Sequence, residues 1–79
     1  MEGESNQRLD WFGRKYDLTP TEARIAVFLA EGGSVAEFAK AFRKSQATVR
    51  THLKAIFRKT GASRQADLSV LVLRRSKML

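Results

Sequence analysis

Residues 45–60, S-Q-A-T-V-R-T-H-L-K-A-I-F-R-K-T, decide the fold, because as a helix they present two faces of opposite chemistry. The apolar residues recur at spacings of three and four and form one stripe: Val49, Leu53, Ile56 and Phe57. Cations spaced four apart project together on another side: Arg50, Lys54 and Arg58. Such a helix can lie in the major groove of DNA. From this stretch alone, an ordinary amphipathic helix with a solvated basic face is an equally good interpretation.

The composition limits the chain to one small domain. Its 79 residues, 43% of them hydrophobic, suffice for one compact core. The lack of cysteine excludes disulfides and thiolate metal sites, and a single histidine, His52, argues against a zinc site. We expect no metal, cofactor or catalytic site, since His52 has no partner and no glycine-rich phosphate loop is present. The apolar runs are too short for a membrane span, so we expect a soluble cytoplasmic protein without membrane contact.

The charge is divided unevenly along the chain, whose formal net charge is +7. Residues 1–39 carry four Lys or Arg against seven Asp or Glu, which gives −3. Residues 40–79 carry eleven Lys or Arg against Asp67 alone, which gives +10. This asymmetry indicates a polyanionic partner on one side of the domain. An anionic membrane is the competing partner, but the cations are spread over several segments, which favours nucleic acid.

Two capping boxes mark the starts of two successive helices. Residues 19–22, T-P-T-E, combine a threonine cap, a proline at the first helical position and a glutamate three residues after the cap. Gly32-Gly33 is expected to end that helix. Residues 34–37, S-V-A-E, form the second box and open a short helix through Phe42.

The remaining helices are predicted from single caps. Ser45 is expected to cap the basic helix and Gly61 to end it. Ser63 is expected to cap a last helix to about Lys77, although the valines of L-S-V-L-V-L at 68–73 keep a short strand open. Residues 1–7 are polar and predict a disordered start, followed by a short helix over 8–16 at most. The predicted fold is all-α, a small four-helix bundle with the N-terminal helix as an optional fifth.

The connection between Phe42 and Ser45 is very short, which is typical of a helix-turn-helix. From Leu18 to about Leu73 the sequence resembles the LuxR/GerE-type DNA-binding domain of bacterial transcription regulators. Four fragments carry the resemblance in the family's order and spacing: L-T-P-T-E-A-R-I-A-V-F-L-A-E-G, A-E-F-A-K-A-F, S-Q-A-T-V-R-T-H-L-K-A-I-F-R-K-T-G and S-R-Q-A-D-L. The resemblance implies a DNA-binding domain over 18–79, preceded by a tail or linker over 1–17.

The resemblance also implies roles for residues of the basic helix. Those expected to face base edges are Arg50, Thr51 and Lys54. Those expected to contact or approach phosphates are Ser45, Thr48 and His52. From charge alone, four further cations are expected to attract phosphates without sequence preference: Arg43, Lys44, Arg58 and Lys59. For Arg50 and Lys54 the alternative is solvated charge, and for His52 it is metal binding or pH sensing.

The family often uses its fourth helix as a dimer interface, which implies a homodimer on two-fold related half-sites. On the last helix the residues expected to lack core contacts are Ala66, Val70 and Leu73, and these form the predicted interface. Packing of the three residues on residues 9–16 is the alternative. The resemblance further implies an ion pair between Glu22 and Arg64, with a capping role alone as the alternative for Glu22.

The turn departs from the family pattern, which commonly has a glycine in left-handed conformation followed by an aliphatic residue. Here the turn is Phe42-Arg43-Lys44-Ser45. A residue with a side chain costs about 1 kcal/mol in that conformation. We therefore expect a turn of different shape or a looser one, with two extra cations near the phosphates.

The predicted function is sequence-specific binding of double-stranded DNA in transcription regulation, with a recognition helix over about 46–60. The alternative is a protein-interaction module, either one that docks on RNA polymerase or an antagonist that dimerises with a full-length regulator. An upstream signal-receiving domain is a further expected partner if the chain is the output domain of a longer regulator. The operator and the direction of regulation stay open.

Overall fold

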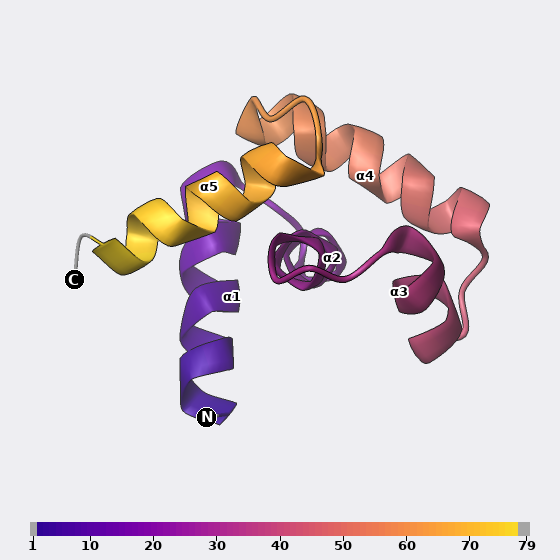
Figure 1. The fold of residues 1–79 in the computed structure, drawn as a ribbon, viewed down its shortest axis with the longest axis horizontal. Coiled ribbons are helices and arrows are strands. Elements are labelled where there is room, and N and C mark those ends of the chain that lie inside the picture. Colours follow the sequence, from indigo (N-terminus) through magenta and orange to yellow (C-terminus); the bar gives the residue numbers. More distant parts are fainter. Residues whose placement is uncertain (1, 78–79) are drawn as a thin grey trace.

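The computed structural model describes the backbone of residues 2–77 and the side chains of residues 9–71. The helices are α1 (Glu2–Tyr16), α2 (Pro20–Ala30), α3 (Val35–Ala41), α4 (Gln46–Thr60) and α5 (Gln65–Lys77). Within this part of the chain every regular element is a helix, so the all-α prediction is confirmed and the strand alternative over 68–73 is wrong. Figure 1 shows α2, seen nearly end-on, in the middle of the other helices.

The prediction for the N-terminus is wrong, because α1 begins at Glu2 rather than near residue 8. Its C-terminal half carries the apolar anchor: Phe12 is fully buried, and its ring lies 5.0 Å from that of Tyr16. A helix held at one end can extend through polar residues, because each added residue contributes one hydrogen bond after the costly first turn has formed. The polarity of residues 2–7 therefore does not indicate a lack of helical structure.

The core is built around α2, which packs against each of the other four helices. Ile25, Ala26 and Leu29 of α2 are fully buried. Both predicted capping boxes are present, with the cap oxygens of Thr19 and Ser34 accepting the N–H groups of Glu22 and Glu37. The arrangement of the other helices therefore depends on how each one attaches to α2.

Side chains of α5 attach it to the C-terminal end of α2. The Gln65 amide donates to the carbonyl oxygens of Leu29 and Gly33, at 2.8 and 2.7 Å, and the Ser69 hydroxyl donates to that of Ala30 at 2.8 Å. These bonds satisfy carbonyls at and beyond the last turn of α2, which has no following turn to bond them. They also fix the rotation of α5, so that Leu68 is fully buried.

The start of α5 differs from the prediction that Ser63 caps it. The helix begins at Gln65, and Asp67 accepts hydrogen bonds from both the N–H and the hydroxyl of Ser63, at 2.9 and 3.0 Å. The cap is thus reversed, because a carboxylate in the first turn of α5 accepts hydrogen bonds from a residue two positions before the helix begins. The same two hydrogen bonds hold the pKa of Asp67 below its ordinary value.

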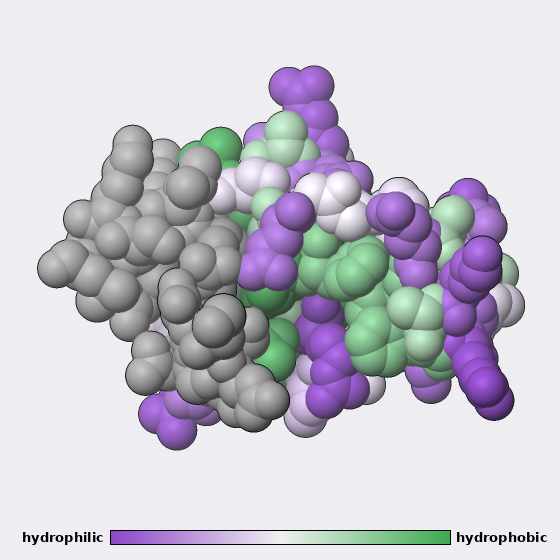
Figure 2. Space-filling view, turned by 60° about the horizontal axis from the view of Figure 1, so that its bottom comes forward, coloured by the Kyte–Doolittle hydropathy of each residue, from purple (hydrophilic) through white to green (hydrophobic). Residues whose placement is uncertain are grey.

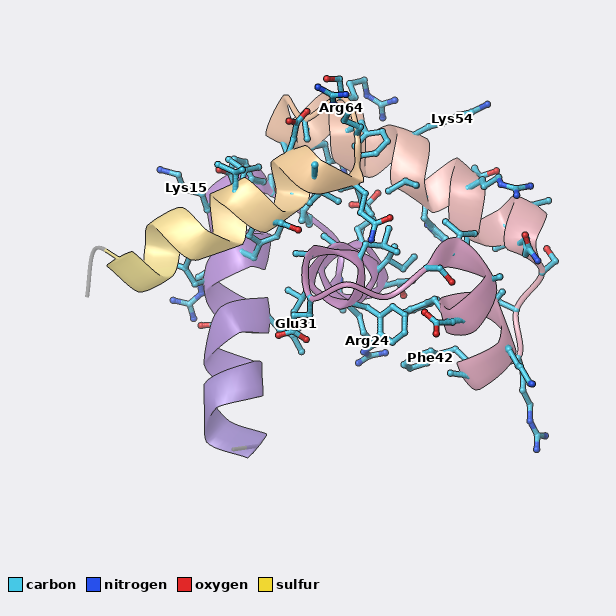
Figure 3. All side chains as sticks on the ribbon, in the orientation of Figure 1. Lys15, Arg24, Glu31, Phe42, Lys54 and Arg64 are labelled. Atoms are coloured by element: carbon cyan, nitrogen blue, oxygen red, sulfur yellow. The ribbon has the colours of Figure 1, made fainter. Side chains whose placement is uncertain are left out.

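The predicted ion pair between Glu22 and Arg64 does not form, since Glu22 pairs with Lys59 instead. The Lys59 ammonium lies 2.8 Å from Oε1 of Glu22, and their side chains are 30% and 8% exposed, respectively. Oε1 of Glu22 also accepts the N–H of Thr19 at 2.9 Å. Arg64 is exposed at the start of α5 (Figure 3). One buried carboxylate therefore both caps α2 and binds the last turn of α4.

The ion pair also shifts the titration of Glu22. Burial of the carboxylate by itself would raise its pKa, but hydrogen bonds from Lys59 and from the Thr19 backbone outweigh burial and hold the pKa below its ordinary value. A group whose pKa is lower in the folded protein stabilises the fold above its unfolded pKa. That stabilisation is lost as the pH falls through the folded pKa.

The turn between α3 and α4 keeps a left-handed residue even though no glycine is present. Arg43 has φ +55°, and its N–H donates to the carbonyl of Lys40 at 3.4 Å. The N–H of Lys44 donates to the carbonyl of Ala39 at 2.8 Å. This is the hydrogen-bond pattern of a Schellman motif. The backbone of this turn therefore has the left-handed residue that the resemblance assigns to the family's glycine, with about 1 kcal/mol of strain at Arg43.

Three phenylalanines fasten α3 and the turn to α2. The rings of Phe28 and Phe38 meet edge to face at 5.4 Å, and Phe42 stacks on Phe38 at 4.2 Å. A Cβ atom at Gly33 would meet the Phe28 ring, which explains a glycine there. Phe42 remains 42% exposed on the lower side of the molecule in Figure 3. Figure 2 turns this side forward and shows hydrophobic surface bordered by hydrophilic side chains.

We predict that Arg43→Gly raises the free energy of unfolding by about 1 kcal/mol, because glycine adopts the left-handed conformation without a steric penalty. Urea denaturation would measure the change. Arg43→Ala is the matched control, since it removes the cation but keeps the Cβ atom, and it should leave stability nearly unchanged. Equal or lower stability of Arg43→Gly would contradict the strain assigned to this residue.

We predict that Glu22→Gln lowers the free energy of unfolding at pH 7 by about 1–2 kcal/mol, because it removes a charge-assisted hydrogen bond. It should also weaken the loss of stability that the wild type shows as the pH falls below 4.5, the ordinary pKa of this group. Thermal unfolding between pH 3 and 7 would measure both effects. Glu37→Gln is the matched control, since Glu37 occupies the same capping position on α3 with its capping bonds exposed. Identical pH profiles for the two variants would exclude a special role for the Glu22 pair.

Candidate nucleic-acid interface

The two faces predicted for α4 are present. Val49 and Ile56 are fully buried, and Leu53 and Phe57 pack against the core cluster. The cations and the threonine predicted to face bases are all exposed: Arg50, Thr51 and Lys54. Figure 3 shows Lys54 pointing away from the rest of the molecule, on the outer side of α4. The apolar stripe therefore fixes the rotation of α4, and this rotation turns the cationic face outward.

The N-terminus of α4 is capped by Ser45, as predicted. Its Oγ accepts the N–H of Thr48 at 3.1 Å, and its hydroxyl donates to Oγ1 of Thr48 at 2.9 Å. The hydroxyl hydrogen of Thr48 is then available for an outside acceptor. Both residues are exposed at the end of the helix where unpaired N–H groups and the helix dipole favour an anion.

Exposed side chains in the first turns of α4 make hydrogen bonds within the helix, one to the backbone and one to another side chain. The Thr51 hydroxyl donates to the carbonyl of Ala47 at 3.0 Å, which leaves its methyl group as the part without a polar partner. Nη2 of Arg50 donates to Oε1 of Gln46 at 3.2 Å. The sequence prediction did not include Gln46, although its spacing of four residues from Arg50 is the spacing at which helical side chains meet.

The residues predicted to attract phosphates are not all equally available. Arg43, Lys44 and Arg58 are exposed at the two ends of α4, and His52 is half-buried. The Lys59 ammonium is held by Glu22. Among the described residues, no group of three or more His, Cys, Asp or Glu side chains is placed to hold a metal ion.

The outer face of α5 carries the residues predicted at a dimer interface. Ala66 is exposed and Val70 is 47% exposed, whereas the Leu73 side chain lies outside the described residues. Leu71 packs against the core cluster. Beside Val70, a hollow of about 210 Å³ is lined by Thr60, Gly61, Ala62, Asp67 and Leu71. The alternative is that these residues pack on residues 9–16, but Ala66 is exposed and about half of Val70 is accessible.

Over residues 2–77, none of the helices is both long enough and apolar enough to cross a bilayer.

Comparison with known families identifies the chain. The model of the family described as bacterial regulatory proteins, luxR family, matches residues 16–72, which include α2, α3, α4 and most of α5. Searches among curated proteins and among solved structures gave no significant match. The matched family is one of DNA-binding regulators and not of enzymes, which agrees with the exposed basic face of α4. The chain belongs to the luxR family of bacterial regulatory proteins, in its helix-turn-helix DNA-binding domain.

Proposed function

We propose that this domain binds double-stranded DNA sequence-specifically in transcription regulation, with α4 lying in the major groove. The observation that supports it best is the division of α4, which buries Val49 and Ile56 and exposes Arg50 and Lys54. A groove about 12 Å wide admits one helix, and only side chains on the outer face can then reach base edges. The family match adds independent support.

Arg50 and Lys54 are the proposed readers of guanine, because both can donate to its O6 and N7 acceptors. They stand one helical turn apart on the exposed face. Thr51 is proposed to contact a thymine methyl group, since its hydroxyl is already bonded to the backbone of Ala47. Together these three residues would cover adjacent base pairs along the groove.

Phosphate contacts are proposed on both sides of these readers. At the N-terminal end the groups are Ser45, Thr48, Arg43 and Lys44, and further along α4 they are His52 and Arg58. Lys59 differs from them, because its ammonium is bonded to Glu22. We therefore assign Lys59 chiefly to holding α4 in place, and any attraction it exerts on phosphate comes second. These contacts would supply affinity and register but no sequence preference.

A homodimer is proposed through the outer face of α5, formed by Ala66, Val70 and Leu73. The half-exposed Val70 and the hollow beside it offer an apolar side chain and a space for its counterpart on a second copy. A two-fold interface of this kind would place two copies of α4 on half-sites related by the same axis.

The same face supports a second candidate function, the binding of a different protein. RNA polymerase or a full-length regulator could occupy the open Val70 surface in place of a second copy. An upstream signal-receiving domain would use the N-terminal side of the chain. A domain acting as an antagonist would bind DNA weakly alone and associate strongly with the other regulator.

We predict that Arg50→Ala and Lys54→Ala each reduce discrimination at one base pair of the preferred duplex by about 1–3 kcal/mol. Most of the affinity for unrelated duplexes should remain. Fluorescence anisotropy on the preferred duplex and its single-base variants would measure both quantities. Arg58→Ala is the matched control, since an exposed cation assigned to phosphate should weaken every duplex alike. Uniform weakening by Arg50→Ala and Lys54→Ala would exclude base reading by these residues.

We predict that Val70→Glu lowers dimer formation on a duplex with two half-sites at least about tenfold, because it buries a charge in an apolar contact. Binding to a single half-site should not change. Sedimentation of protein–DNA mixtures would distinguish dimer formation on the duplex with two half-sites from binding to a single half-site. Val70→Asn adds no charge but places a polar group in the apolar contact, so it should also lower dimer formation. If Val70→Glu unfolds the protein, Val70 belongs to the core; if dimerisation is unaffected, the interface lies elsewhere.

A further inference from the structure

We propose that Gln46 is a positioning residue that sets the direction of Arg50 and thereby sharpens its preference for guanine. This inference rests on the proposed function, because it assumes that α4 lies in the major groove. Gln46 would act through Arg50 and not by contact of its own with a base. It would thus determine specificity at the position of the DNA that Arg50 faces.

The contact that carries the proposal is a hydrogen bond on the outer face of α4. Nη2 of Arg50 donates to Oε1 of Gln46 at 3.2 Å, one helical turn toward the N-terminus. Both residues are exposed, so no packing of the core holds the guanidinium in this place. Among the described residues, the surface neighbour Gln46 is therefore the group that directs the arginine.

The direction matters because of where the guanidinium then lies. Long side chains on a helix lean toward its N-terminus, and the bond to Gln46 keeps Arg50 over the first turn. In a helix-turn-helix, the N-terminal residues of the recognition helix contact base edges. The bond uses one N–H of the planar guanidinium, at Nη2, and leaves the other N–H groups for O6 and N7 of guanine. Without it, the flexible side chain could turn to a phosphate instead.

The chemistry of the partner also favours positioning over neutralisation. The cation that braces the fold, Lys59, is paired with a carboxylate, Glu22. The cation on the reading face, Arg50, is paired with a neutral amide. An amide fixes the geometry of the guanidinium but leaves its full positive charge for the DNA. No Asp or Glu occurs within residues 46–60, so α4 itself contributes no competing carboxylate.

Two substitutions separate positioning from charge. Gln46→Ala removes the acceptor and should lower the preference for guanine at the Arg50 position about three- to tenfold, with little change on unrelated duplexes. Gln46→Glu keeps an acceptor and should retain that preference. It should weaken binding to all duplexes, because the carboxylate reduces the positive charge of the face. Anisotropy titrations on the preferred duplex and its three variants at the Arg50 position would give these ratios.

A double-mutant cycle distinguishes positioning from direct contact. In the Arg50→Ala background, Gln46→Ala should have no further effect on base preference. An equal effect in both backgrounds would mean that Gln46 contacts a base itself, which would overturn the proposal. Unchanged preference of Gln46→Ala in the wild-type background would overturn it as well.

A measurement without DNA separates failure of this inference from failure of the proposed function. NMR relaxation of the Arg50 guanidinium should show an ordered Nε–H group in the wild type and a mobile one in Gln46→Ala. Equal mobility in both proteins would overturn the positioning role whatever the DNA experiments give. An ordered Arg50 in a protein without any sequence preference would instead overturn the proposed function and, with it, the specificity role. Thermal unfolding would confirm that each variant is folded.

Discussion

The bond between Lys59 and Glu22 is the constraint on which the rest of the structure depends. It joins the last turn of α4 to the first turn of α2, the helix that contacts all the others. Since Glu22 also accepts the Thr19 N–H, the same carboxylate begins α2 and anchors α4. At the other end of α4, Val49 is fully buried. With both ends held, the outward face of α4 is fixed before any partner binds.

Polar groups, and not only the apolar core, determine how the helices attach. Gln65 and Ser69 bond to carbonyl oxygens at the end of α2 and so set the rotation of α5. That rotation leaves Val70 outward beside a hollow. The turn before α4 keeps its hydrogen bonds although Arg43 adopts a left-handed conformation. A cation thus occupies a position where glycine would be less strained, next to the helix end that favours anions.

Much of the fold could be predicted from the sequence, because local signals determine it. The capping boxes at 19–22 and 34–37 and the buried stripe of α4 depend on residues within a few positions of one another. The partner of Glu22 could not be predicted, because Lys59 and Arg64 both follow at long range and only packing decides which one reaches it. The extent of α1 depended on the anchoring of Phe12, which polarity alone does not reveal. At the candidate site, the exposure of Arg50 and Lys54 followed from periodicity. The part played by Gln46 was not predicted, because an uncharged residue does not stand out in a search for cations.

The most direct test of sequence reading by α4 is the affinity of the wild-type protein for two duplexes over a salt series. One duplex would be selected from a randomised pool, and the other would have the same composition in shuffled order. We predict that both affinities fall steeply with salt, since phosphate contacts release counterions, while the selected duplex stays at least about tenfold tighter throughout. Equal affinities at every salt concentration would contradict sequence reading and reduce the basic face of α4 to an electrostatic anchor.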